Sequence, residues 1–159
     1  MDIYTIDKEY SCEIIIKKSR FIGYLFNVNN QSEAQEVLKE IRKKHYDATH
    51  NCYAYIIKDN DQTLIKSSDD GEPGGTAGVV IYEVLKKNNL TNIICIVTRY
   101  FGGIKLASKP FGSSNKKRMR MHPFFCWWFL DVRDSNGAGV NDSPVDCQSR
   151  EGLFRRKAN

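Results

Sequence analysis

Carboxylates suited to catalysis or ligand binding gather in one short loop of this sequence. Asp69, Asp70 and Glu72 lie within four residues, and three glycines accompany them. Glycines before a helix leave backbone amides free to hold an anion, but three carboxylates repel a phosphate unless a cation intervenes. The alternative is a structural turn in which Asp69 or Asp70 accepts hydrogen bonds from backbone amides. The residue types leave both readings open.

An arginine, Arg99, follows the apolar run of residues 93–98. A charged group at that place must reach water, a carboxylate or a ligand, because burying a bare charge is costly. A salt bridge with one of the loop carboxylates and a role in binding are therefore both open. Gly102 and Gly103 come next and indicate a sharp bend or a close approach of the backbone.

Histidine and cysteine chemistry receives less support. His45 and His50 lie near the end of an expected helix and the start of an expected strand. His50 with the loop carboxylates has the donor types of a metal site, but the spacing does not require one, and we expect neither metal nor cofactor. The five cysteines lack Cys-x-x-Cys spacing, which argues against a zinc site or a disulfide framework. Cys52 and Cys95 fall in apolar runs and are expected to be buried thiols.

The elements that must position these residues can be predicted from periodicity. Residues 13–17, 20–28, 50–58 and 93–98 have the composition of strands, and residues 63–66 that of a short returning strand. Apolar residues at 34, 37, 38 and 41 predict a helix that Ser32 caps together with Gln35. A second helix is expected over residues 76–87. The order predicts an α/β two-layer sandwich of about four strands and two helices. The expected core comprises Ile15, Phe21, Val37, Leu38, Ile41, Ile56, Val84, Leu85, Ile94 and Ile96.

Charge is distributed unevenly along the chain. Basic and acidic residues balance over residues 1–106, and the whole net charge of +5 falls in residues 107–159. The basic character that would suggest nucleic acid therefore comes from the part that looks least like a folded domain, and we expect no DNA partner. The sequence has no apolar run of 18 residues and no signal-peptide pattern at its start. We expect a cytoplasmic protein that does not bind membranes.

Four segments together resemble a known family. They are Lys17–Ile22, Asp47–Tyr55, the loop Ser67–Gly78 and the run Thr98–Leu106. This combination is similar to the Impact N-terminal (YigZ-type) family. The resemblance implies a fold like that of ribosomal protein S5 domain 2, and it makes His50 a site candidate because Asp47–Asn51 matches a family motif.

The family resemblance also implies a function. Impact-type proteins of eukaryotes interfere with activation of a translation-initiation kinase by binding its co-activator. We therefore expect a non-enzymatic binding module that acts on translation or its stress response, with a protein, the ribosome or RNA as partner. The alternative is a small hydrolase or phosphotransferase that uses Asp69, Asp70 and Glu72 with His50 and Arg99. The binding candidates are His50, Ser67, Ser68, Asp69, Asp70, Gly71, Glu72, Arg99, Gly102, Gly103 and Lys105.

The resemblance ends at Leu106, where Ala107 replaces the glycine of the family. We expect residues 1–106 to form the domain, which lacks the last helix that is usual in the family. Residues 107–159 are expected to be a basic, aromatic tail without a fold of its own. A shifted reading frame, a divergent native tail and a strip that binds RNA or membrane are the three explanations.

Overall fold

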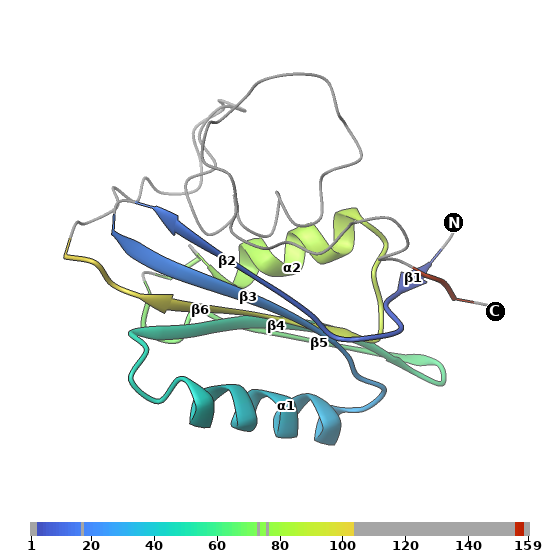
Figure 1. Cartoon of the computed structure of the whole chain (residues 1–159). Helices are drawn as coiled ribbons and strands as arrows, with labels where there is room; N and C mark the ends of the chain where they lie inside the picture. Colours follow the sequence, from blue (N-terminus) through green and yellow to red (C-terminus); the bar gives the residue numbers. More distant parts are fainter. Residues whose placement is uncertain (1–2, 17, 73, 76, 104–154, 158–159) are drawn as a thin grey trace.

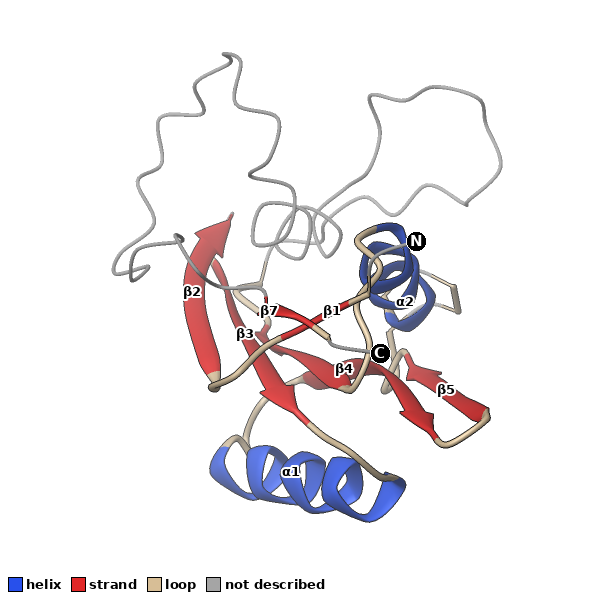
Figure 2. Ribbon diagram, turned by 90° about the vertical axis from the view of Figure 1, so that its right-hand side faces the viewer, coloured by secondary structure: helices blue, strands red, loops and turns tan. Residues whose placement is uncertain are grey.

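A five-stranded antiparallel sheet forms the centre of the protein. The structure, a computed structural model, describes residues 3–16, 18–72, 74–75, 77–103 and 155–157. The strand order is β2-β3-β6-β4-β5, with helices on opposite faces (Figures 1 and 2). The elements of the sheet and its helices are β2 (Tyr10–Ile16), β3 (Ser19–Asn27), α1 (Gln31–Lys44), β4 (His50–Asp59), β5 (Gln62–Ser68), α2 (Gly78–Lys87) and β6 (Ile93–Tyr100). The predicted class, an α+β sheet with two helices, is confirmed.

The most apolar strand lies at the middle of the sheet. β6 pairs with β3 on one side and with β4 on the other, and residues 93–99 are all buried. Strand β4 buries alternate residues on both faces, with Cys52 and Ala54 toward α2 and Tyr53 and Tyr55 toward α1. A strand covered on both faces has apolar residues at successive positions. Both strands therefore occupy the interior places that their composition predicts.

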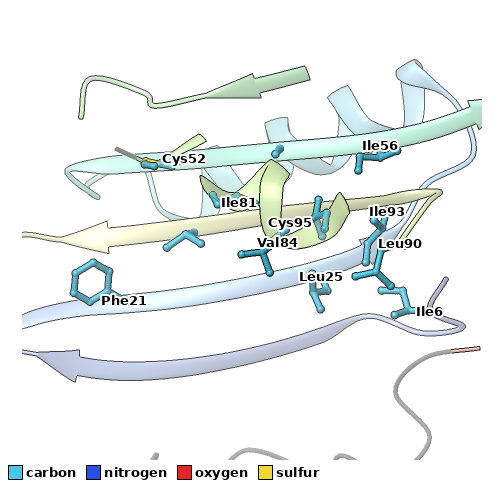
Figure 3. Packing of buried hydrophobic residues seen from close by; sticks show 14 residues of the cluster. Ile6, Phe21, Leu25, Cys52, Ile56, Ile81, Val84, Leu90, Ile93 and Cys95 are labelled. Atoms are coloured by element: carbon cyan, nitrogen blue, oxygen red, sulfur yellow. The ribbon is translucent and has the colours of Figure 1, made fainter. Parts of the chain in front are cut away.

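Each helix closes one apolar layer of the sheet. Figure 3 shows the layer on the α2 face, where Ile81 and Val84 pack over Phe21, Leu25 and Cys95. The layer on the α1 face gathers Leu38 and Ile41 of the helix with tyrosines and isoleucines of the strands. Eight of the ten residues of the predicted core are buried, and Val37 is partly buried.

The prediction for Ile15 was wrong, since 64% of this residue is exposed. β2 is an edge strand, and Ile15 lies opposite Arg20 on the α1 face. Helix α1 packs mainly beneath β4, so it does not cover that position. Burial at an edge depends on what lies above it, which periodicity does not reveal.

The helix cap was also predicted at the wrong residue. Asn30, not Ser32, is the N-cap of α1, and its side chain accepts a hydrogen bond from the Glu33 amide at 2.9 Å. Glu33 in turn accepts from the Asn29 amide at 2.7 Å. The pattern Asn-x-x-Glu therefore performs the task that we assigned to Ser-x-x-Gln, because either pair can satisfy the free amides of a first turn.

The two ends of the chain meet in a small second sheet that the sequence did not predict. β1 (Tyr4–Thr5) pairs antiparallel with β7 (Arg155–Arg156). Lys157 donates its backbone amide to Ile3 and its Nζ to Asn92 Oδ1 at 2.6 Å. Residues 104–154 lie outside the described part of the chain. That residues 107–159 have no fold of their own stays a prediction.

Candidate functional site

The loop carboxylate Asp69 caps helix α2. Its Oδ1 accepts hydrogen bonds from the amides of Ala77, at 3.0 Å, and Gly78, at 2.7 Å, and its Oδ2 accepts from Gly75 at 2.9 Å. The helix's own N-cap, Ala77, has no side chain that can do this. Asp69 therefore neutralises the positive end of α2 and occupies the amides at which an anion would bind.

Asp70 ties the same loop to the start of β4. Its Oδ2 accepts from the Asn51 amide at 2.7 Å, and its Oδ1 lies 3.8 Å from Nη2 of Arg42. The backbone is left-handed at Asp70 (φ 43°) and at Gly71 (φ 86°). Glycine adopts this conformation without steric cost, whereas for aspartate the surrounding bonds must hold it.

The register of the sheet brings His50 beside Arg99. His50 of β4 lies opposite Arg99 of β6, and Phe21 of β3 lies opposite Arg99 on its other side. His50 Nδ1 is 2.8 Å from the carbonyl oxygen of Asp70. Because a carbonyl only accepts, Nδ1–H donates this hydrogen bond. Nε2 of His50 faces Glu72 Oε1 at 3.8 Å, which is too long for a hydrogen bond.

Glu72 and Arg99 form a buried ion pair above this row. Arg99 Nη1 donates to Glu72 Oε1 at 2.8 Å, and the two side chains are 10% and 6% exposed. The guanidinium lies over the rings of Phe21 and Phe101, at 5.4 and 5.6 Å from their centroids. Arg99 Nε has no hydrogen-bond partner among the described residues. The ion pair between Arg99 and a loop carboxylate that the sequence suggested is therefore present, and it is buried.

At the glycine pair Gly102 and Gly103, the backbone after β6 comes close to the backbone that precedes β3. A Cβ on Gly102 would lie 1.9 Å from the carbonyl oxygen of Lys18, so no other residue fits there without movement. The Gly102 amide also donates to Ser19 Oγ at 3.2 Å. Gly103 is exposed and its surroundings are open. Lys105, the last of the candidates, lies outside the described residues.

The two serine candidates end strand β5. Ser68 Oγ accepts from the Asp70 amide at 3.2 Å and so helps to set the turn. Ser67 is exposed and lies opposite Ala54 of β4. The structure thus brings His50, Ser68, Asp69, Asp70 and Glu72 together with Arg99 at one end of the sheet.

Cys52 is not set up as a nucleophile. Burial raises the pKa of its thiol far above the ordinary value, and the nearby carboxylates of Glu72, Asp70 and Asp69 act in the same direction. The protonated thiol donates to the carbonyl oxygen of Asp69 at 3.1 Å. Cys52 and Cys95 are both buried free thiols, as predicted. Among the described residues, no group of three or more histidines, cysteines and carboxylates is placed to hold a metal ion.

A second polar network at this end of the sheet was missed in the sequence. His45, which is buried, lies between two tyrosine hydroxyls, with Nε2 at 2.6 Å from Tyr24 and Nδ1 at 2.6 Å from Tyr100. Tyr100 donates to Asp47 Oδ1 at 3.2 Å. Its hydroxyl must therefore accept from Nδ1–H of His45, and Tyr24 donates to Nε2. Burial, and next the charges of Lys44 and Arg20, lower the pKa of His45.

What the arrangement leaves available is a surface rather than a reactive group. Asp69 and Asp70 are bound to backbone amides, and Glu72 is bound to Arg99. Phe101, whose ring lies against the Arg99 guanidinium, remains 45% exposed, and Tyr46 of the turn before β4 is 86% exposed. We call Tyr46, His50, the loop 69–75 and Phe101–Gly103 the sheet-end surface. It lies where α1 and β6 end and β4 begins (Figure 1).

The fold and this site define a small α+β domain with an ion pair and carboxylate–amide hydrogen bonds at one end of its sheet. The sequence model of the Impact N-terminal domain matches residues 17–121. This chain therefore belongs to the Impact N-terminal domain family. The match continues past Leu106, so part of the segment that we treated as tail falls within the family's domain.

Individual relatives agree with this assignment. The chain is 52% identical over 105 residues to the IMPACT family member YvyE of Bacillus subtilis, covering 66% of this chain and 48% of the relative. It is 40% identical over 98 residues to the IMPACT homolog of Dictyostelium discoideum, covering 60% of this chain and 28% of the relative. A solved structure described as a hypothetical protein is 34% identical, with a TM-score of 0.63, and covers 67% of this chain and 52% of that one. The chain spans about half the length of the first of these relatives. Within the described residues, no helix is long and apolar enough to cross a membrane.

Proposed function

We propose that this chain is a non-enzymatic binding module that acts on translation or on its stress response. The family resemblance implies action by binding another protein, as expected for the eukaryotic members, and this chain is 40% identical over 98 residues to a eukaryotic IMPACT homolog. One observation carries the choice of binding over catalysis. The three carboxylates that would have to act as base or nucleophile are engaged in holding the loop 69–75 and Arg99.

The sheet-end surface is the proposed contact with the partner. Phe101 stands beside an arginine that Glu72 holds in place, so the aromatic ring is presented at little entropic cost. Aromatic anchors next to arginine are frequent at the energetic centres of interfaces. The binding candidates His50, Ser67–Glu72, Arg99, Gly102, Gly103 and Lys105 belong to this proposal. The partner is a component of the translation apparatus, either a protein or the ribosome.

The test compares two exposed apolar residues on the full-length chain. Phe101→Ala is expected to lower recovery of the partner at least tenfold, both in co-sedimentation with ribosomes and in affinity capture followed by mass spectrometry. Ile15→Ala is the matched control, since Ile15 is 64% exposed and lies on the α1 face. Binding is measured at about 0.1 M salt, where electrostatic contacts are still appreciable. Failure to recover a ribosome or a translation factor, or equal losses in the two variants, contradicts the proposal.

A third variant, Asp70→Ala, tests the enzymatic alternative. A hydrolase or phosphotransferase that uses Asp70 must lose turnover in Asp70→Ala, and it must turn over a phosphate ester or a similar substrate in the unmodified chain. We expect no turnover above background in either form. Turnover that disappears in Asp70→Ala, with the fold intact by circular dichroism, would replace the binding module by an enzyme.

A further inference from the structure

Among the described residues, strand β5 is an open edge of the main sheet. It pairs with β4 and stands last in the strand order, at the free end of the sheet in Figure 2. Among the described residues, no backbone hydrogen bond outside the β4 ladder involves residues 62–68. An edge of this kind offers a row of amides and carbonyls to another strand.

Most of the usual protections against strand pairing are absent from the described residues of this edge. Residues 62–68 contain neither proline nor glycine, and Lys66 is the one charged residue of the strand. The strand runs regularly for seven residues and five of them are exposed. Natural edge strands are normally short, bulged, charged or covered. A regular edge whose one charge is Lys66 is available to pair with another strand.

The exposed apolar residue of β5 stands at its midpoint. Ile65 is the fourth of the seven residues and is 50% exposed, on the face that carries α2. A two-fold axis through the middle of an antiparallel pair places the central residue opposite itself. In that arrangement each Ile65 covers the exposed area of the other.

The remaining pairs of such a symmetric arrangement are compatible. With Ile65 opposite Ile65, Leu64 of one copy lies opposite Lys66 of the other, Thr63 lies opposite Ser67, and Gln62 lies opposite Ser68. Thr–Ser pairs are favourable across strands, and like charges directly opposite are not. The two lysines stand diagonally, about 8 Å apart, a separation at which 0.15 M salt already screens exposed charges.

We propose that two copies of this chain pair through β5 in an antiparallel, two-fold arrangement centred on Ile65. The two sheets then continue into one sheet of ten strands, with both α2 helices on the same side. The partner is a second copy because the strand is complementary to itself at its apolar centre, Ile65, and at the hydroxyl pair of Thr63 with Ser67. This interface is centred on Ile65 and shares Ser67 and Ser68 with the binding candidates at the end of β5, but it does not depend on the proposed function.

Cysteine cross-linking tests the register directly. In the full-length chain, Ile65→Cys puts two thiols at the centre of the pair, within the 4.4–6.8 Å between Cα atoms that a disulfide requires. Thr63→Cys is the matched control on the same face of the same strand, but its two copies are offset by four residues, roughly 13 Å along the strand. Under mild oxidation Ile65→Cys is expected to form dimer at least tenfold faster than Thr63→Cys or the unmodified chain. Equal rates would overturn the proposed register.

A charge at the centre of the interface tests the association itself. Sedimentation equilibrium of the unmodified chain should show a concentration-dependent dimer, and Ile65→Lys should raise its dissociation constant at least tenfold. Val79→Lys places the same charge on another exposed apolar residue, 42% exposed on α2, and should leave the constant within about twofold. Unfolding curves verify that both variants fold. A chain that stays monomeric at all concentrations, or a dimer that Ile65→Lys leaves unchanged, overturns the proposal.

Discussion

Two polar clusters lie at the same end of the sheet, on opposite faces, and they are built on different chemistry. The ionic cluster on the α2 face holds the carboxylates of Asp69 and Glu72 against backbone amides and Arg99. The tyrosine–histidine network on the α1 face joins Tyr24, His45 and Tyr100 by hydrogen bonds. Both fix a loop to the sheet. In the ionic cluster, loss of one charged partner leaves the other charge buried and unpaired. The tyrosine–histidine network instead depends on a histidine that stays neutral.

The largest effect is expected from breaking the buried ion pair. Glu72→Ala leaves the Arg99 guanidinium without its carboxylate in a place that water hardly reaches. Removing one partner of a buried pair costs about 3–5 kcal/mol, mostly because the other charge stays unpaired. The free energy of unfolding, measured in urea, should fall by that amount.

The double variant Glu72→Ala/Arg99→Met sharpens this result. It removes both charges, so it should recover a large part of the stability that Glu72→Ala loses. If the double variant instead loses as much unfolding free energy as the two single substitutions added together, the ion pair does not couple the two residues. The ionic cluster would then not differ in kind from the tyrosine–histidine network.

A smaller effect is expected from the helix cap. Asp69→Ala removes the acceptor of three amides, and loss of a helix cap costs about 1–2 kcal/mol. Amide exchange should rise first in residues 77–80 at the start of α2. Asp61→Ala, an exposed carboxylate in the β4–β5 turn, is the control and should change stability by less than about 0.5 kcal/mol. Equal effects would show that Asp69 does not cap the helix.

The smallest effect is expected from the tyrosine–histidine network, and it depends on pH. Burial, Lys44 and Arg20 lower the pKa of His45 in the fold, against the opposing charges of Asp47 and Glu13. The folded state therefore binds fewer protons than the unfolded chain, and its stability falls as the pH drops below about 6.5. His45→Gln removes this titration at the cost of roughly one hydrogen bond, about 1 kcal/mol. The difference in unfolding free energy between the two proteins should shrink from pH 8 to pH 5. A constant difference would contradict the prediction.

Local pattern predicted most of the elements because their signals lie within a few residues. Residues 93–98 form a buried strand, and the helix near residues 76–87 begins at Gly78 and ends at Lys87. The predictions that were wrong concern features that depend on the tertiary structure and not on the local sequence. Ile15 is exposed because α1 does not reach the edge strand, and Asn30 caps α1 because the chain turns there and not at Ser32.

The structure brings several of the candidate site residues together, but their bonding partners could not be predicted from the sequence. Asp69, Glu72, Arg99 and His50 meet because antiparallel register puts β4 beside β6 and the loop above both. The structural alternative for the carboxylates, bonds to backbone amides and to Arg99, is what the structure contains. His45 carried no signal beyond being a lone histidine, since its two tyrosine partners lie 21 and 55 residues away in the sequence.

Sequence alone determined the family, the order of the elements and the residues that could form a site. These depend on short motifs, on periods of two and of 3.6 residues, and on the cost of burying an isolated arginine. The tertiary structure alone decided which carboxylate bonds which amide, which histidine is buried and which strands stand at the edges of the sheet that the described residues form. Those outcomes depend on the register and on which face each helix covers, and both are set by contacts between residues far apart in the chain.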